Sequence, residues 1–283
     1  PKALNALDHT MIRELMAILD QMDADETIRG LWIESSAEKA FCAGGDVRDV
    51  THSGQRGGLT DLTNSADYLA DEYLLDVRLQ LSQKPVIAWC DGYIMGGGMG
   101  VFQGADVRVV TEHSSLAMPE VRIGFVPDCG GSWFLNRVTH GLGICLAMSG
   151  ATVGAVDACW LNFACRFLPR AAKAGLSDAV CGLDFSSKVN ALGGLVALLA
   201  QATAESSRQG PWETHGARLA QQVRHQKPDA VFAMMQQWHQ HVPELFIGLD
   251  QASPGAAMVA GHQFIRARFE SLYEAVVQEH DLG

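Results

Sequence analysis

Three consecutive glycines, Gly96 to Gly98, interrupt a stretch that is otherwise apolar. They follow Pro85–Cys90, which has the length and composition of a buried strand, and they open a predicted short helix near Met99–Gln103. Glycine inside regular structure costs about 0.5–1 kcal/mol relative to alanine, so this position must gain something from bare backbone. We expect another group, from the protein or from a ligand, to approach the backbone closely here.

Strands and helices alternate along the first part of the chain. A helix is predicted over His9–Met22, with Asp8 as its cap and Met11, Leu15, Ile18, Leu19 and Met22 on one face. The short apolar pattern of strands is found at Gly30–Glu34, Val86–Cys90 and Val107–Thr111. This alternation predicts an α/β architecture. After about Ala171 the sequence turns alanine-rich and helical, so we expect a core over 1–170 and a mostly helical region over 171–283.

Composition narrows the class of protein. The chain has 283 residues, 48% of them hydrophobic, which is enough for a sizeable core. The formal net charge of −11 argues against nucleic acid as a partner, because affinity for phosphate backbones needs clustered Lys and Arg. No apolar run reaches the roughly 20 residues of a membrane helix. The nearest, Leu192–Ala202, is predicted to be a buried helix, so we expect no membrane partner.

Cysteine and histidine usage predicts free thiols and no metal. The seven cysteines are odd in number and contain no C-x-x-C pair, which indicates a reduced compartment. The ten histidines show neither H-x-x-x-H nor H-E-x-x-H spacing. We therefore expect no metal site.

Two glycine turns could bind a ligand through backbone. They are Ala43-Gly44-Gly45-Asp46 and Gly96–Gly98. Two N–H groups that converge on one point form an oxyanion hole. The alternative is that both are tight turns that need positive φ, and for a single glycine pair this is the commoner outcome. A nucleotide-binding P-loop is excluded, since G-x-x-x-x-G-K-[ST] is absent.

Three carboxylates stand in apolar surroundings. Glu120 and Asp128 lie eight residues apart, and paired acids are suited to general acid–base or nucleophilic chemistry. Equally, Glu120 after a proline suits a helix start and Asp128 before Cys-Gly-Gly suits a turn. Glu72 falls on the apolar stripe of a helix predicted over Ser65–Leu81, where burying it is costly unless it has a partner or lines a cavity.

Three motifs together resemble the enoyl-CoA hydratase/isomerase (crotonase) superfamily. They are FCAGGDV at Phe41–Val47, DGYIMGGGMG at Asp91–Gly100 and AMPEVRIGFVPDCGGSWFL at Ala117–Leu135. The opening PKALNALD is similar too, so the resemblance is strong over about 1–171 and weaker beyond. It implies an α/β crotonase (ClpP-like) fold, in which repeated strand–helix units form a core sheet, followed by a helical C-terminal region.

Within that superfamily the pattern is most similar to the hydrolases of 3-hydroxyisobutyryl-CoA, enzymes of valine catabolism. The resemblance implies an oxyanion hole made by the N–H groups of Gly45 and Gly97. Glu120 would attack the thioester or activate a water molecule, and Asp128 would orient the substrate hydroxyl or that water. Glu72 would line the acyl pocket.

The resemblance also implies how coenzyme A binds. Its adenine end would lie near Lys2, Ala3, Ala43 and Asp46, held largely by backbone. CoA is then part of the substrate, and no separate cofactor is expected. The expected partner is acyl-CoA, with self-association into a homo-oligomer left open. The expected compartment is the cytoplasm of a bacterium or the mitochondrial matrix of a eukaryote.

Gly100 separates this pattern from that of the hydratases. Hydratases of the superfamily that this chain resembles carry a glutamate at this position, paired with the glutamate that corresponds to Glu120. Because this chain has glycine there, we do not expect it to add water across a double bond with two glutamates. A hydratase or isomerase of the same superfamily and a non-catalytic acyl-CoA binder or assembly subunit remain the alternatives. Relative to the family pattern we expect segments beyond both ends of the given sequence, Pro1 and Gly283.

Overall fold

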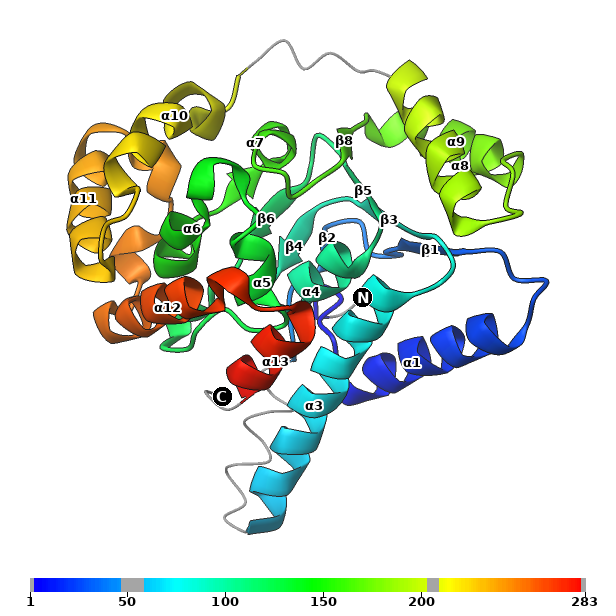
Figure 1. Cartoon of the computed structure of the whole chain (residues 1–283), viewed down its shortest axis with the longest axis horizontal. Coiled ribbons are helices and arrows are strands. Elements are labelled where there is room, and N and C mark those ends of the chain that lie inside the picture. The colour runs from blue at the N-terminus through cyan, green and yellow to red at the C-terminus, as the bar shows by residue number, and fades with distance from the viewer. Residues whose placement is uncertain (1–2, 47–58, 203–208, 281–283) are drawn as a thin grey trace. The chain divides into compact units, whose positions relative to one another are not determined.

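The computed structural model describes residues 3–46, 59–202 and 209–280, and side chains of the helix that begins at Leu59 from Asp67 onward. The chain forms two compact units, each assembled from two separate stretches of sequence (Figure 1). The first unit comprises Pro1–Ser114 and Arg166–Ala204, and the second comprises Ser115–Cys165 and Glu205–Gly283. Each unit is described by itself below.

The first unit contains a four-stranded parallel sheet and the helices that pack against it. Its strands are β1 (Leu31–Glu34), β2 (Ala40–Cys42), β3 (Val86–Cys90), β4 (Tyr93–Met95), β5 (Val107–Val110) and β8 (Arg166–Phe167). Its helices are α1 (His9–Ala24), α3 (Leu59–Leu81), α4 (Gly97–Gly104), the 3-10 turn η3 (Arg170–Ala172), α8 (Lys173–Cys181) and α9 (Lys188–Gln201). Strand order in the main sheet is β1-β3-β5-β8. β2 and β4 pair separately, also in parallel.

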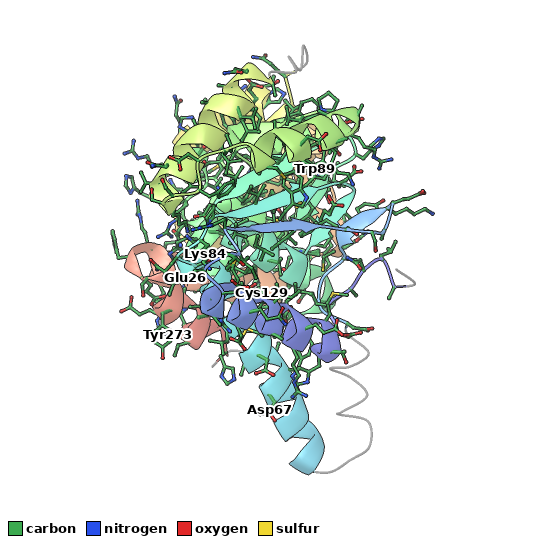
Figure 2. All side chains as sticks on the ribbon, turned by 90° about the vertical axis from the view of Figure 1, so that its right-hand side faces the viewer. Glu26, Asp67, Lys84, Trp89, Cys129 and Tyr273 are labelled. Carbon is green, nitrogen blue, oxygen red and sulfur yellow. The ribbon has the colours of Figure 1, made fainter. Side chains whose placement is uncertain are left out.

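The core of the first unit lies between the main sheet and α8 and α9. Ile87 and Trp89 of β3 and Val107 and Val109 of β5 point to this side. Figure 2 shows Trp89 there, and its ring stacks on Trp32 of β1 at 6.3 Å between centroids. The helices contribute buried side chains to the same cluster, namely Leu176, Val180, Leu195 and Leu199.

α1 begins where the sequence predicts. Asp8 is its cap, since a carboxylate oxygen of Asp8 accepts the N–H of Met11 at 2.8 Å. The predicted buried face is confirmed at Leu19 and Met22 but not at Ile18, which is 41% exposed, and Ile12 is buried as well. At its far end α1 is held by Lys84, which donates to the carbonyl of Asp25 at 2.8 Å and lies near Glu26 in Figure 2.

α3 and α4 pack closely against each other through glycines of α4. The α4 face toward α3 carries Gly97, Gly100 and Gly104. A Cβ at Gly100 would lie 2.8 Å from Oδ1 of Asp76, and one at Gly104 would lie 2.8 Å from Cβ of Leu79. The glycines therefore let α3 approach to a distance that no larger residue permits. On the other side of α4, a Cβ at Gly98 would lie 2.6 Å from the carbonyl oxygen of Cys42.

The second unit is mostly helical. Its strands β6 (Ser115–Ala117) and β7 (Val153–Gly154) pair antiparallel. Its α-helices are α5 (Gly131–Leu135), α6 (Gly143–Ser149), α7 (Ala155–Trp160), α10 (Pro211–Val223), α11 (Pro228–His241), α12 (Pro254–Arg266) and α13 (Leu272–His280). Its 3-10 turns are η1 (Glu120–Ile123), η2 (Thr139–Gly141), η4 (Pro243–Phe246), η5 (Leu249–Gln251) and η6 (Ala267–Phe269). α12 packs on α6, where Gly261 meets the sulfur of Met148.

The apolar run predicted as a buried helix is amphipathic instead. α9 buries Ala191, Leu195 and Leu199, while Val196 is 62% exposed. In the ranges that the structure describes, no helix combines the length and the apolar character required to cross a bilayer.

Replacing Gly100 by alanine should destabilise the protein by about 1–3 kcal/mol, because the new methyl group would overlap the buried Asp76 carboxylate. Gly193→Ala is the matched control. Gly193 lies inside α9 with no atom within 4 Å of the added Cβ, so this change should stabilise by about 0.5–1 kcal/mol. Urea denaturation of both variants measures the difference. Equal effects on the free energy of unfolding would show that α3 and α4 are not in tight contact.

Candidate active site

Gly45 lies three residues after the end of β2, in a parallel bridge with Leu7. Leu7 N–H donates to the carbonyl of Gly44 at 2.8 Å, and Asp46 N–H donates to the carbonyl of Leu7 at 2.7 Å. Because the residues on either side of Gly45 make the bridge bonds, the N–H of Gly45 points away from Leu7. The bridge thus leaves this N–H to other acceptors and fixes its direction.

Gly97 is the first residue of α4. Gly96 precedes it with φ of 50°, a left-handed backbone that favours glycine. The first N–H groups of a helix have no acceptor within the helix, and the partial positive charge of the helix end adds to them. Gly97 therefore presents an N–H suited to a developing negative charge.

The carboxylate of Glu72 brings these two glycines together. Its Oε1 lies 3.7 Å from the position of a Cβ on Gly45, and it would overlap a Cβ on Gly97. Glu72 is buried on α3, as is Tyr68 one turn earlier. The Tyr68 hydroxyl lies 2.6 Å from the same Gly45 position and donates to the carbonyl of Leu7 at 2.9 Å. Gly45, Gly97 and Glu72 thus meet at one place in the first unit.

The residues predicted to hold CoA surround the same turn. The side chain of Asn5 donates to the carbonyl of Phe41 at 2.7 Å, which ties the segment that contains Ala3 to the end of β2. Ala43 follows β2 directly, and Asp46 donates its N–H to the carbonyl of Leu7 at 2.7 Å. Lys2 lies outside the described residues. Backbone N–H and carbonyl groups of residues 41–46 are concentrated in this region, so a ligand could be recognised here through the backbone.

Cys42 is adjacent to the glycine turn but is unsuited to act as a nucleophile. Burial raises the pKa of its thiol to about 12, and the nearby carboxylates of Glu72 and Asp76 act in the same direction. A thiol with this pKa is not a thiolate at neutral pH. Chemistry at this place must come from other groups.

Glu120 opens η1 in the second unit and is buried. The turn is closed by Gly124, whose φ is 84°, and by the N–H of Phe125, which donates to the carbonyl of Glu120 at 3.0 Å. Arg122 anchors the turn through a bond to the carbonyl of Ile247 at 2.7 Å. Burial lowers the pKa of Arg122, while the negative charge of Glu120 acts in the opposite direction.

Asp128 is also buried and begins a tight turn. Cys129 and Gly130 both have left-handed backbone, with φ of 53° and 76°, and the N–H of Gly131 donates to the carbonyl of Asp128 at 2.7 Å. Two central residues with positive φ define a type I′ turn. Cys129 is strained in this conformation, since a side chain disfavours it. Glu120 and Asp128 thus sit on either side of one loop, each held by its own turn.

Glu279 of α13 is a second buried acid near Asp128 that sequence reasoning missed. Its carboxylate accepts the N–H of Gly130 at 2.7 Å, the N–H of Ser132 at 2.8 Å and the Ser132 hydroxyl at 2.5 Å. Burial, assisted by the charge of Asp128 and opposed by these bonds, raises the pKa of Glu279 to about 8. The sequence signal was its spacing from Leu272, Ala275 and Val276, which places it on the apolar face of α13.

Asp76 was also missed. It lies four residues after Glu72, so both project from one face of α3, and it is buried. Its carboxylate fills the space next to Gly100 that a larger residue would occupy. The spacing of Asp76 from Glu72 was a signal that the two share one face of α3, although it does not indicate that Gly100 lies opposite.

Comparison with known proteins places this geometry in a known fold. A carnitinyl-CoA dehydratase from Mycobacterium thermoresistibile has a TM-score of 0.83 and 30% sequence identity, over 99% of this chain and 78% of that one. The predicted α/β crotonase fold is therefore confirmed.

The family profile described as enoyl-CoA hydratase/isomerase matches residues 1–283, and the chain belongs to that family. Among curated relatives, the mitochondrial 3-hydroxyisobutyryl-CoA hydrolase of Gallus gallus is 36% identical over 67% of this chain. The small ribosomal subunit protein mS47 of Neurospora crassa is 36% identical over 59% of it. These matches cover 48% and 33% of the relatives, so the matched part of this chain spans half of their length or less.

The buried Glu279 should make stability fall as pH rises. In the unfolded chain its pKa is near 4.5 and in the folded chain about 8. Between these values the folded chain retains a proton that the unfolded chain has lost, so the free energy of unfolding declines across this window and the decline is complete above it. Denaturation at about pH 5, 7 and 9 should show a weaker decline for Glu279→Gln. Parallel pH profiles for the two proteins would contradict this.

Proposed function

We propose that the chain is an acyl-CoA thioester hydrolase. The proposed substrate is a short-chain 3-hydroxyacyl-CoA, with 3-hydroxyisobutyryl-CoA as the first choice, and the products are 3-hydroxyisobutyrate and CoA. Support comes from the family to which the chain belongs and from the name of the Gallus gallus relative. That name also supports the mitochondrion as the compartment in a eukaryote, with the matrix proposed within it.

One observation carries the proposal. Gly45, at the end of a strand, and Gly97, at the start of a helix, adjoin the same carboxylate of Glu72. Their N–H groups are proposed to bind the carbonyl oxygen of the thioester, where negative charge develops when the carbonyl is attacked. A single donor of this kind contributes about 3–4 kcal/mol to lowering a barrier. Glu72, buried beside both glycines, would contact the acyl group.

Glu120 and Asp128 are proposed as the acids of the reaction. Glu120 either attacks the acyl carbon, to give an anhydride that water then cleaves, or removes a proton from the attacking water. In both routes oxygen bonds to the acyl carbon, the carbon–sulfur bond breaks, and the departing sulfur of CoA receives a proton. Asp128 would orient the substrate hydroxyl or the water.

The CoA portion is proposed to lie along Ala3, Ala43 and Asp46, with Lys2 nearby. Because CoA leaves as a product, it is a part of the substrate and no separate cofactor is needed. Acyl-CoA is the proposed partner.

The mS47 relative supports a second candidate, a non-catalytic subunit of a larger assembly. The two candidates differ in whether thiol is released. Short acyl-CoAs, each with and without a 3-hydroxyl group, should be mixed with the protein while free thiol is titrated. Release from none of them would favour the subunit.

Glu120→Gln should reduce thiol release by about 10²–10⁴-fold, because the amide neither attacks nor accepts a proton. Binding of the CoA ester, measured by calorimetry, should remain. The control is Glu244→Gln, an exposed glutamate of η4 in the same unit. A Glu120→Gln variant that retains full activity would exclude Glu120 from the reaction.

Crotonyl-CoA should not be hydrated at a useful rate, because position 100 has no carboxylate of its own and Asp76 fills the space beside it. Loss of one acid–base group costs about 10²–10⁴-fold. Loss of the enoyl absorbance is followed in one cuvette, and thiol release from 3-hydroxyisobutyryl-CoA in another. Fast enoyl loss without thiol release would make the chain a hydratase.

A further inference from the structure

The turn that carries Asp128 contacts α13, a helix that lies far from it in the sequence. Asp128 to Gly131 form a turn with two left-handed residues, one of them the non-glycine Cys129. Strained backbone persists only where the surroundings impose it. The surroundings that impose it here are contributed by α13.

α13 meets the turn through one face. Leu272, Ala275, Val276 and Glu279 recur at i, i+3, i+4 and i+7, so they share a face, and Ala275 and Glu279 are fully buried. At one end of this face a methyl group of Leu272 lies 2.8 Å from the position of a Cβ on Gly130. Tyr273, labelled in Figure 2, is 68% exposed and belongs to another face of the helix.

At the other end of this face Glu279 accepts three hydrogen bonds from the turn, two of them from backbone N–H groups. These N–H groups belong to Gly130 and Ser132, on either side of Gly131, whose own N–H closes the turn on Asp128. The three hydrogen bonds offset part of the cost of burying this carboxyl group, a cost that packing in the core alone would leave in full.

We infer that Glu279 is a positioning residue that fixes Asp128 by clamping the Asp128–Ser132 turn to α13. The inference rests on the proposed function only for the role of Asp128 in the reaction; the clamp itself does not depend on it. Besides burial, the negative charge of Asp128, in the same turn, raises the pKa of Glu279. Loosening the clamp should therefore also alter the pH dependence of any reaction in which Asp128 takes part.

Hydrogen exchange, followed by mass spectrometry without substrate, tests the clamp. Glu279→Gln should speed exchange of the Gly130 and Ser132 amides by about tenfold or more, since the two amides bond to different oxygens of the Glu279 carboxyl group and a glutamine side chain has only one oxygen. The control is Glu274→Gln, an exposed glutamate of α13 that binds Ser271. Unchanged exchange in Glu279→Gln would overturn the inference.

If Glu279→Gln does not fold, Ser132→Ala serves in its place. It removes only the hydroxyl donor and should loosen the same amides to a smaller extent. Protection of the turn that is unchanged in Ser132→Ala would then overturn the inference.

A double-mutant cycle tests whether Glu279 acts through Asp128. Glu279→Gln should lower kcat for thiol release about tenfold, with KM within about twofold, per folded molecule. In an Asp128→Asn background the same change should have no further effect. Independent, multiplicative effects would reduce Glu279 to a structural residue. If wild-type protein releases no thiol, the proposed function fails, and the exchange experiment still decides whether the clamp exists.

Discussion

The contact between α3 and α4 is the constraint on which the candidate site depends. Three glycines of α4, Gly97, Gly100 and Gly104, face α3, where Glu72, Asp76 and Leu79 fill the space that side chains would otherwise take. Those same glycines begin α4 at Gly97. The same packing coincides with the start of α4, buries two carboxylates, and lies beside the first N–H groups of α4, which have no acceptor within the helix. At these glycines, the free energy gained by close packing of the helices offsets the conformational entropy that glycine loses on folding.

Local features of the sequence were predictable. The strand Val86–Cys90 matches β3 residue for residue, and the Asp8 cap is present, because each depends on neighbouring residues alone. The buried face of α1 was predicted less well. Its partner is α3, and only the packing of the two helices decides that Ile12 is buried and Ile18 exposed. The fold and family followed from motifs, which the whole-chain match confirmed.

The supports of the site were beyond prediction from sequence. Glu279 reaches Ser132 across a separation of 147 residues, which no periodicity indicates. The left-handed Cys129 could not be inferred either, since glycine is the residue expected in that conformation. Asp76 differs from these two, because its spacing from Glu72 was visible, but its meaning appears only with Gly100 opposite. How Gly45, Gly97, Glu120 and Asp128 act together stays a prediction.

The division of each unit into two stretches of sequence affects how the chain is made. β5 cannot acquire its partner β8 until Arg166 and Phe167 have left the ribosome, and the core of the first unit also needs α8 and α9. Meanwhile Ser115–Cys165 has emerged and must wait for the residues after 204. Such long-range contacts slow folding and leave apolar surface uncovered during synthesis. In a nascent chain of this architecture, apolar surface of each unit therefore stays uncovered until the later stretch of that unit has been translated.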